Sequence, residues 1–577
     1  MSKKIKKQIK KSMPLLIIFS LLWSTMAIGL VFNFDFSFYD LSLNRPEALA
    51  DVATTTVSVL NASPYFTVGP FEQPFSTNTS PINVGGDITF TAKAQDPELD
   101  NYYLLVCGDD TGQANNGGAP SCTGEPFCVS GATGTGASST CTYTGISDPG
   151  GETDVWYAYV CDAHATEAAC TLASQGSGDG GSPFYVNHAP TISLVTTSDN
   201  NKAPGGTFTV QITATDTDVN LADTIYFDIC GTNSWASTTH CAVQLCQATS
   251  TIQGGATTTT CQFTDTAPTP DQNYTYFAYI RDWHDFAGTN NGTSTYYTIV
   301  NVAPSITSVM LHGGINIEPN IKGAAEVTAT TTAVVTDNNG CADLANATSS
   351  IYWSNATNLE NCTADDNNCY QMTTVECAQT SGSCTGVTDS NAIYICTTTI
   401  AFHAVPTDVG TWTATNWLAG LKGIDNNGAF GVGTTTTGVE LIAAAALDVD
   451  QSGIDYGTMN AGNDTGDNNA TTTIVNYGNT PIDTTVQAQD DMKSGSYFIL
   501  ATQQEWSLTN FTWGTGTDLA SSSVSIDIDV LINRPTNQTD VTDDLYWGLG
   551  LPVTTHSGDY TGTTTFSVVM DMDGNWN

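Results

Sequence analysis

The phrase VNHAPTISLV at residues 186–195 returns as VNVAPSITSV at residues 300–309, and a fainter copy, LNASP, stands at residues 60–64. The spacing of about 120 residues is that of whole domains rather than of a solenoid repeat. Each copy places a proline before alternating apolar and polar residues, which is typical of a stiff junction that leads into a first β-strand. The sequence of 577 residues is therefore predicted to contain several repeated β domains.

The stretch after each phrase continues the repeat. Two glycines precede DITFTAKAQD at residues 87–96 and TFTVQITATD at residues 207–216, and Gly323 precedes a similar run that ends at Asp337. Strict alternation predicts strands with one buried face. An aromatic strand and a late strand that ends near an aspartate turn follow in each copy. We place the aromatic strands at 102–107, 225–230 and 351–353, the late strands at 155–160, 276–280 and 411–414, and the turns at Asp162, Asp282 and Asp425.

These boundaries divide the chain into an N-terminal segment and four domains. The predicted ranges are 1–50, 51–187, 188–301, 302–442 and 443–577. The last range has no cysteine, and its predicted strands are 471–476, 482–488, 524–531 and 563–570. The expected fold class is all-β, with tandem β-sandwiches.

The charge balance excludes one class of partner. Charged residues make up only 12% of the chain, but beyond Ala50 it holds 54 acidic and 7 basic residues, a formal charge of −47. Such a surface repels phosphate backbones, so nucleic acid is not an expected partner.

The N-terminus indicates export. Lysines end at Lys11, and an uncharged apolar run extends from Pro14 to Phe32, the order that secretion machinery recognises. Two outcomes remain open: a signal peptide cleaved after Ala27 or Ala50, or a retained membrane anchor. In both cases the remainder of the chain is expected to be extracellular.

The cysteines agree with an oxidising compartment. They number six, four, six and none in the four domains, as expected for disulfide-bonded secreted domains. Arg281 occupies the position of Cys161, and the second domain also lacks a counterpart of Cys170, which predicts a Cys161–Cys170 bond. For the shared positions we favour nested pairing, one of three connectivities. The nested bonds are Cys107–Cys141, Cys122–Cys128, Cys230–Cys261 and Cys241–Cys246.

The strand order and the aspartate-bounded loops resemble the Ig-like, cadherin-like and PKD-like repeats of prokaryotic surface proteins, over residues ~52–442. The YWGLGLP phrase at 546–552 resembles the terminal sandwich of bacterial and archaeal envelope proteins. These resemblances imply β-sandwich modules strung as a stalk or sheet, and no particular ligand.

No motif of a hydrolase, zinc protease or nucleotide-binding enzyme occurs in the sequence. His164 and His284 stand in matching Asp-x-His turns, but the third copy has Asp425-Asn426-Asn427 there, which favours aspartates that accept local backbone hydrogen bonds. We expect a protein that is not an enzyme.

Calcium binding explains so many carboxylates better than catalysis does. Carboxylate oxygens on loops bind Ca²⁺, and the bound ion stiffens the junctions between domains. Three candidate sets follow from the loops: Asp96, Glu98 and Asp100; Asp216, Asp218 and Asp223; and Asp448, Asp450 and Asp455. The last set begins like an EF-hand but has Met459 where the bidentate glutamate belongs.

Together these features predict a structural cell-surface protein, S-layer-like or stalk-forming, that associates with itself or with other envelope components. An adhesin or carbohydrate-binding surface protein, with glycans as partners, is the alternative. A third possibility is that the chain is the accessory region of an extracellular hydrolase.

Overall fold

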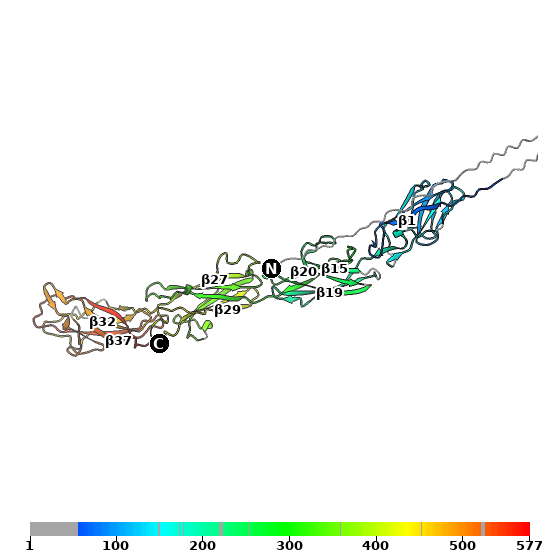
Figure 1. The fold of residues 1–577 in the computed structure, drawn as a ribbon. Helices are drawn as coiled ribbons and strands as arrows, with labels where there is room; N and C mark the ends of the chain where they lie inside the picture. Colours follow the sequence, from blue (N-terminus) through cyan, green and yellow to red (C-terminus); the bar gives the residue numbers. More distant parts are fainter. Residues whose placement is uncertain are drawn as a thin grey trace, which may run out of the picture. The chain divides into compact units, whose positions relative to one another are not determined.

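A computed structural model describes residues 56–576, apart from residues 148–150, 172, 177, 219–222, 253, 358, 452 and 521–525. The protein is all-β, as predicted: the described residues form strands, turns and short 3-10 helices (Figure 1). The predicted signal or anchor segment, residues 1–50, lies outside the described residues. In the described part of the chain, no helix has the length and apolarity needed to cross a bilayer. We call the four predicted domain ranges modules 1 to 4.

Module 1 is a sandwich of two three-stranded sheets with a small third sheet at one side. The first sheet is β1 (Tyr65–Gln73), β3 (Ile88–Gln95) and β8 (Ser138–Tyr143), and the second is β10 (Tyr157–Asp162), β4 (Tyr102–Cys107) and β7 (Cys128–Val129). The third joins β2 (Ile82–Asn83), β11 (Phe184–Asn187) and β9 (Thr153–Asp154). Phe90 and Trp156 pack edge to face in the core, with ring centroids 4.9 Å apart.

Module 2 repeats this order. One sheet is β12 (Thr191–Ser198), β14 (Thr207–Asp216) and β19 (Gly255–Thr264). The facing sheet is β13 (Asn201–Lys202), β21 (Thr293–Ile299), β20 (Asn273–Arg281), β15 (Asp223–Cys230) and β18 (Gln244–Ile252). Along β14 the buried residues alternate with more exposed ones, so the period-two pattern does mark one face turned to the core.

Module 3 keeps the two sheets and adds strands within its cysteine-bearing insertion. One sheet is β22 (Ser305–Leu311), β23 (Val327–Thr336), β27 (Asn391–Ile400) and β26 (Cys377–Gln379). The other is β25 (Cys369–Met372), β24 (Leu344–Trp353), β28 (Trp417–Asp425) and β29 (Phe430–Thr434).

The late strand of module 3 was predicted in the wrong place. Residues 411–414 do not form it: Gly410–Trp412 is a 3-10 turn, and the strand that pairs with β24 is β28, which starts at Trp417. The turn begins at Gly410 with φ +70, a left-handed conformation that glycine adopts without strain. Trp412 then packs against Trp353, with ring centroids 5.5 Å apart, instead of pairing in the sheet.

Module 4 is a sandwich of different strand order. Its larger sheet is β30 (Leu447–Val449), β31 (Ala470–Asn476), β38 (Thr542–Leu549), β35 (Gln504–Ser507) and β36 (Thr517–Asp518). The smaller is β37 (Ile526–Ile532), β32 (Ile482–Ala488) and β39 (Thr564–Met570), and β33 (Met492–Ser494) forms a hairpin with β34 (Tyr497–Ile499). The fully buried Trp547 lies in its core.

All sixteen cysteines form disulfides, eight in number, and none is free. The structure joins Cys161 to Cys170. The nested pairing is wrong, because neighbouring cysteines pair in sequence. The bonds are Cys107–Cys122, Cys128–Cys141, Cys161–Cys170, Cys230–Cys241, Cys246–Cys261, Cys341–Cys384, Cys362–Cys369 and Cys377–Cys396.

Strand placement explains the correction. Cys128 lies on β7 of one sheet and Cys141 on β8 of the facing sheet, and Cys246 on β18 and Cys261 on β19 repeat this arrangement in module 2. These two bonds therefore join the two sheets of each sandwich across its core. Each of these bonds joins two edge strands, whereas the nested bonds Cys107–Cys141 and Cys230–Cys261 would have started from the inner strands β4 and β15. In place of the nested bonds Cys122–Cys128 and Cys241–Cys246, Cys122 and Cys241 pair with the inner-strand cysteines Cys107 and Cys230.

We predict that removing the inter-sheet disulfide of module 2, as Cys246→Ala with Cys261→Ala, lowers its free energy of unfolding by about 3 kcal/mol. The bond closes a sequence separation of 15 residues, and a loop of that length contributes about this much by restricting the unfolded chain. Denaturant unfolding of the oxidised protein measures the change. Unreduced peptide maps that join Cys246 to Cys241 would contradict the pairing.

Candidate functional site

Three aspartates end the late strands of modules 1 to 3 in the same turn. Asp162, Asp282 and Asp425 are each buried, at 1%, 0% and 2% exposure. The Oδ1 atom of each accepts the N–H two residues further on and a second N–H beyond it. The donors are His164 and Ala169, His284 and Phe286, and Asn427 and Ala429. The turn interpretation of the Asp-x-His motifs is thus confirmed for the aspartates.

The linker asparagine of the repeated phrase binds the other oxygen of each turn. Nδ2 of Asn61, Asn187 and Asn301 donates to Oδ2 of Asp162, Asp282 and Asp425 over 2.6, 2.7 and 2.9 Å. We call this hydrogen bond the Asn–Asp clamp. The amide of Asn187, at the joint before module 2, also donates to Oδ1 of Asn83 in module 1, over 2.9 Å. The clamp therefore fixes the linker at the end of the sandwich that follows it.

A second loop holds the residue after the linker asparagine. The N–H groups of Ala62, His188 and Val302 donate to side-chain oxygens of Glu98, Asp218 and Asn339 over 3.3, 2.9 and 2.8 Å. Two residues before each acceptor stands an aspartate: Asp96, Asp216 or Asp337. Its Oδ1 accepts the N–H of Glu98, Asp218 or Asn339 over 2.9, 3.0 and 2.7 Å.

The remaining oxygen of these three aspartates has no hydrogen-bond partner. Oδ2 of Asp96, Asp216 and Asp337 is buried and unpaired, and the residues are 0%, 4% and 0% exposed. Burial raises the pKa of both Asp216 and Asp337 to about 6, and repulsion from neighbouring carboxylates adds to the rise. The linker asparagines match this pattern, because Oδ1 of Asn61, Asn187 and Asn301 is also buried without a partner.

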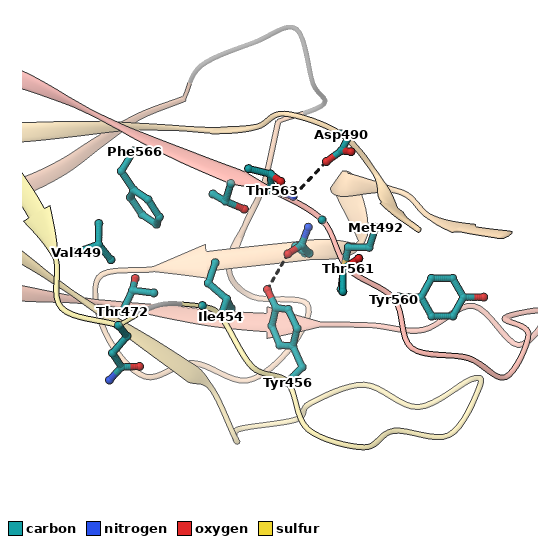
Figure 2. Close-up of a pocket in the computed structure, with 15 residues that line it drawn as sticks. Val449, Ile454, Tyr456, Thr472, Asp490, Met492, Tyr560, Thr561, Thr563 and Phe566 are labelled. Carbon is teal, nitrogen blue, oxygen red and sulfur yellow. Dashed lines mark hydrogen bonds between the residues drawn. The ribbon is translucent and has the colours of Figure 1, made fainter. Parts of the chain in front are cut away.

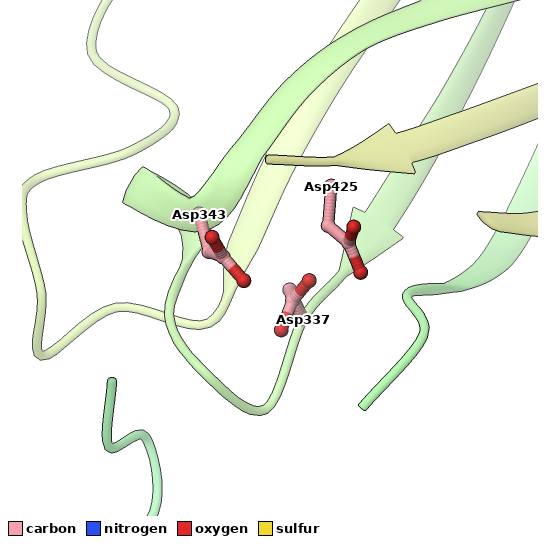
Figure 3. A group of neighbouring side chains, drawn as sticks. All are labelled: Asp337, Asp343 and Asp425. Atoms are coloured by element: carbon pink, nitrogen blue, oxygen red, sulfur yellow. The ribbon is translucent and has the colours of Figure 1, made fainter. Parts of the chain in front are cut away.

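Module 3 brings three of these carboxylates together. Asp337 follows β23, Asp425 ends β28, and Asp343 lies on the 3-10 turn Cys341–Asp343 before β24. One oxygen from each lies within 4.8 Å of the others, and Figure 3 shows the three side chains turned toward a common centre. Oδ2 of Asp343 is a further buried, unpaired oxygen.

The other predicted calcium ligands are placed differently. Asp100 donates its N–H to Asp96, and both oxygens of Asp218 accept hydrogen bonds from His188. Asp223 begins β15, but its side chain lies outside the described residues. Asp448, Asp450 and Asp455 are exposed in and after β30, and Oδ1 of Asp455 accepts the N–H of Gly457.

Sequence reasoning grouped the aspartates that are close along the chain and missed the grouping across strands. The position of Asp343 depends on where β24 begins, and the approach of Asp337 to Asp425 depends on where β23 and β28 end. The recurrence of Asn61, Asn187 and Asn301 at one position of the phrase was the available signal.

The junction of modules 3 and 4 uses a buried arginine. Nε of Arg534 donates to the Trp576 carbonyl over 2.9 Å, and its Nη1 donates to Oδ1 of Asn367 and to the His403 carbonyl over 2.9 and 2.7 Å. The guanidinium also stacks on Trp412, 5.0 Å from the ring centre. Arg534 is 3% exposed, and burial lowers its pKa to about 10, which leaves it charged at neutral pH.

Module 4 also holds a cavity of about 510 Å³. Tyr456, Ile454, Phe566 and Met492 contribute apolar surface, and Asp490 is the carboxylate of the lining (Figure 2). The Tyr456 hydroxyl donates to Oε1 of Gln504 over 2.9 Å, and burial raises the pKa of its phenol. This mixture of apolar surface, hydroxyl and amide groups and one carboxylate suits binding of a polar molecule without negative charge.

The fold and the disulfides define a tandem Ig-like β-sandwich protein. No protein-family model matches the chain, and no curated protein matches it. Solved structures with similar sandwiches include a marsupial T cell receptor (9% identity, TM-score 0.24, covering 62% of this chain and 98% of that one). A D1–D4 ectodomain fragment of ICAM-5 has 9% identity and TM-score 0.24, covering 87% of this chain and 99% of that one. A 1.5-MDa bacterial ice-binding adhesin has 13% identity and TM-score 0.17, covering 65% of this chain and 98% of that one. At these TM-scores no functional conclusion follows.

We predict that Asn187→Ala lowers the free energy of unfolding of module 2 by about 1–3 kcal/mol, the cost of leaving a buried acceptor unsatisfied. The change removes the hydrogen bond to the buried Oδ2 of Asp282. Thermal unfolding in chelator measures it. Asn273→Ala is the control, because that exposed amide pairs with Thr298 at the surface, and an equal loss in both variants would contradict the role of the clamp.

We predict that Arg534→Ala destabilises the junction of modules 3 and 4 by about 3 kcal/mol, since charged hydrogen bonds to three acceptors are lost. Arg534→Lys keeps the positive charge but not the planar guanidinium with its several N–H donors. It should therefore restore less than half of the stability that Arg534→Ala loses. Limited proteolysis and denaturant unfolding report both effects. Lys493→Ala, at a side chain 49% exposed, should leave them unchanged.

Proposed function

We propose that the chain is a structural protein of the extracellular cell surface, an S-layer-like or stalk-forming component that performs no catalysis. The observation that carries this proposal is the repeated joint between modules: a linker asparagine bound by a buried aspartate at the start of modules 1 to 3. Joints of this kind suit a chain that holds its modules at set spacings.

The disulfides support the extracellular part of the proposal. Eight bonds and no free cysteine fit a protein of an oxidising compartment outside the cytosol. Two of the bonds cross the sandwich core, which suits modules that must resist unfolding at a surface.

An adhesive role is the second candidate, and the module 4 cavity favours it. Its tyrosine, threonine and glutamine groups are those that hydrogen-bond and stack on a sugar or a similar neutral ligand. Glycan-array binding that is lost in Tyr456→Ala and kept in Tyr497→Ala, an exposed tyrosine of β34, would establish this role in place of a purely structural one.

Electron microscopy of the native envelope tests the structural proposal. We expect a periodic array or regularly spaced stalks that antibodies against module 2 label from outside intact cells. Deletion of the coding sequence should remove the array and leave cell-associated hydrolase activities unchanged. Labelling only after cells are opened, or a protein recovered solely as a freely diffusing monomer, would overturn the proposal.

A further inference from the structure

We propose that module 3 contains a calcium site formed by carboxylate oxygens of Asp337, Asp343 and Asp425, with the side-chain oxygen of Asn301 as a further ligand. A cation here is independent of the surface role proposed above, because the ligands belong to the sandwich and its own linker.

The first support is geometric. Three carboxylate oxygens from three separate segments lie within 4.8 Å of one another, a spacing that a single ion in their midst can satisfy. The segments are the end of β23, the turn before β24 and the end of β28, so the sandwich itself fixes their positions. Figure 3 shows the side chains converging from these elements.

The second support is a buried, unpaired oxygen on one member of the group. Asp337 is fully buried at 0% exposure, and its Oδ2 has no hydrogen-bond donor. A buried carboxylate without a partner costs several kcal/mol, so proteins rarely retain one without a function. The oxygens Oδ2 of Asp343 and Oδ1 of Asn301 are likewise buried and unpaired, which gives three free oxygens from three residues.

The third support is recurrence. Modules 1 and 2 place the same unpaired aspartate oxygen and the same unpaired asparagine oxygen at the same joint, as Asp96 with Asn61 and Asp216 with Asn187. The repeated modules therefore keep these unpaired oxygens at equivalent positions of the joint. Among the described residues, module 3 is where a group of three carboxylates forms, with Asp343 as the third member.

The local charge calls for a cation. Asp271 of module 2 adds to the repulsion felt by Asp337, and its Oδ2 accepts a hydrogen bond from Asn427 over 2.6 Å. Among the ion pairs of the described residues, none involves Asp337, Asp343 or Asp425. A divalent cation is therefore the group that neutralises them.

The ligand chemistry favours calcium over other metals. All the donors are oxygens, whereas structural zinc sites in proteins are built from cysteine sulfur and histidine nitrogen. Calcium accepts six to eight oxygens in irregular arrangements, and backbone carbonyls or water complete such a set, whereas magnesium requires a near-ideal octahedron. Extracellular modules bind calcium with dissociation constants of about 0.1–1 mM.

The test compares calcium binding and thermal stability of the full-length protein after treatment with EDTA and desalting. Calcium chloride is titrated by calorimetry at fixed ionic strength, with magnesium chloride and sodium chloride as separate arms. Wild-type protein should bind calcium saturably and unfold at a higher temperature in its presence. Asp337→Asn should weaken the module 3 site at least tenfold, while Asp366→Asn, an exposed aspartate of the same module, should titrate like the wild type.

The sign of the stability change separates a metal ligand from a merely structural aspartate. In EDTA, Asp337→Asn should unfold at a higher temperature than the wild type, because it removes a repelled buried charge. In saturating calcium it should unfold at a lower temperature, because it loses a ligand. Asp343→Asn, on the half-buried turn, should show the same crossover and serves if Asp337→Asn fails to fold. No calcium binding beyond the sodium arm, or no crossover in a folded variant, would overturn the proposal.

Discussion

The Asn–Asp clamp is the interaction on which the joints of modules 1 to 3 depend. A buried carboxylate is most stable when both oxygens accept hydrogen bonds. Each late-strand aspartate achieves this with two backbone N–H groups on one oxygen and the linker amide on the other. The linker cannot move away without leaving a charged oxygen unpaired inside the protein. One aspartate side chain consequently fixes the turn after the late strand, together with the linker and the first strand of the same module.

The second loop of each joint leaves one oxygen of Asp96, Asp216 or Asp337 without a donor. Module 4 shows how the chain avoids an unpaired oxygen at a similar strand end. Asn476 stands at the end of β31, and its Oδ1 accepts the N–H of Gly478 while its Nδ2 donates to the carbonyls of Thr480 and Asn533. A neutral amide thus satisfies both its ends where Asp337 leaves one free. The nearby junction takes its positive charge from Arg534, a residue of the chain itself. The stability of the joint alone therefore does not explain why modules 1 to 3 carry a carboxylate at this position.

Strand positions followed from the sequence wherever alternation was strict, as in β14 and β32, because burying one face of a strand leaves a period of two in the residues themselves. Prediction failed where tertiary contacts decide. Trp412 resembled a strand residue, but it packs on Trp353 and Arg534 instead. The disulfides pair in sequence because β7 and β8, and β18 and β19, are edge strands of facing sheets, which spacing along the chain does not reveal. For the same reason, Asp96, Asp216 and the three aspartate turns could be identified one by one from the sequence. That the strand ends bring these aspartates close together could not be predicted from it.

The distribution of basic residues limits how copies of this chain can attract one another. Beyond Ala50 there are seven, and six are already engaged within the chain. The six are Lys202 with Asp199, Arg281 with Asp285, Lys322 with Asp540, Lys493 with Asp490, Lys422 over the Phe430 ring, and Arg534 in its buried junction. Only Lys93 remains exposed without such a contact among those described. Apart from Lys93, a basic residue could pair with a neighbouring copy only by giving up an internal contact. The repulsion from a charge of −47 meanwhile acts over about 8–10 Å in ordinary salt. Attraction between such surfaces must therefore come from apolar or hydrogen-bonding contacts, or from cations that the acidic loops recruit from outside.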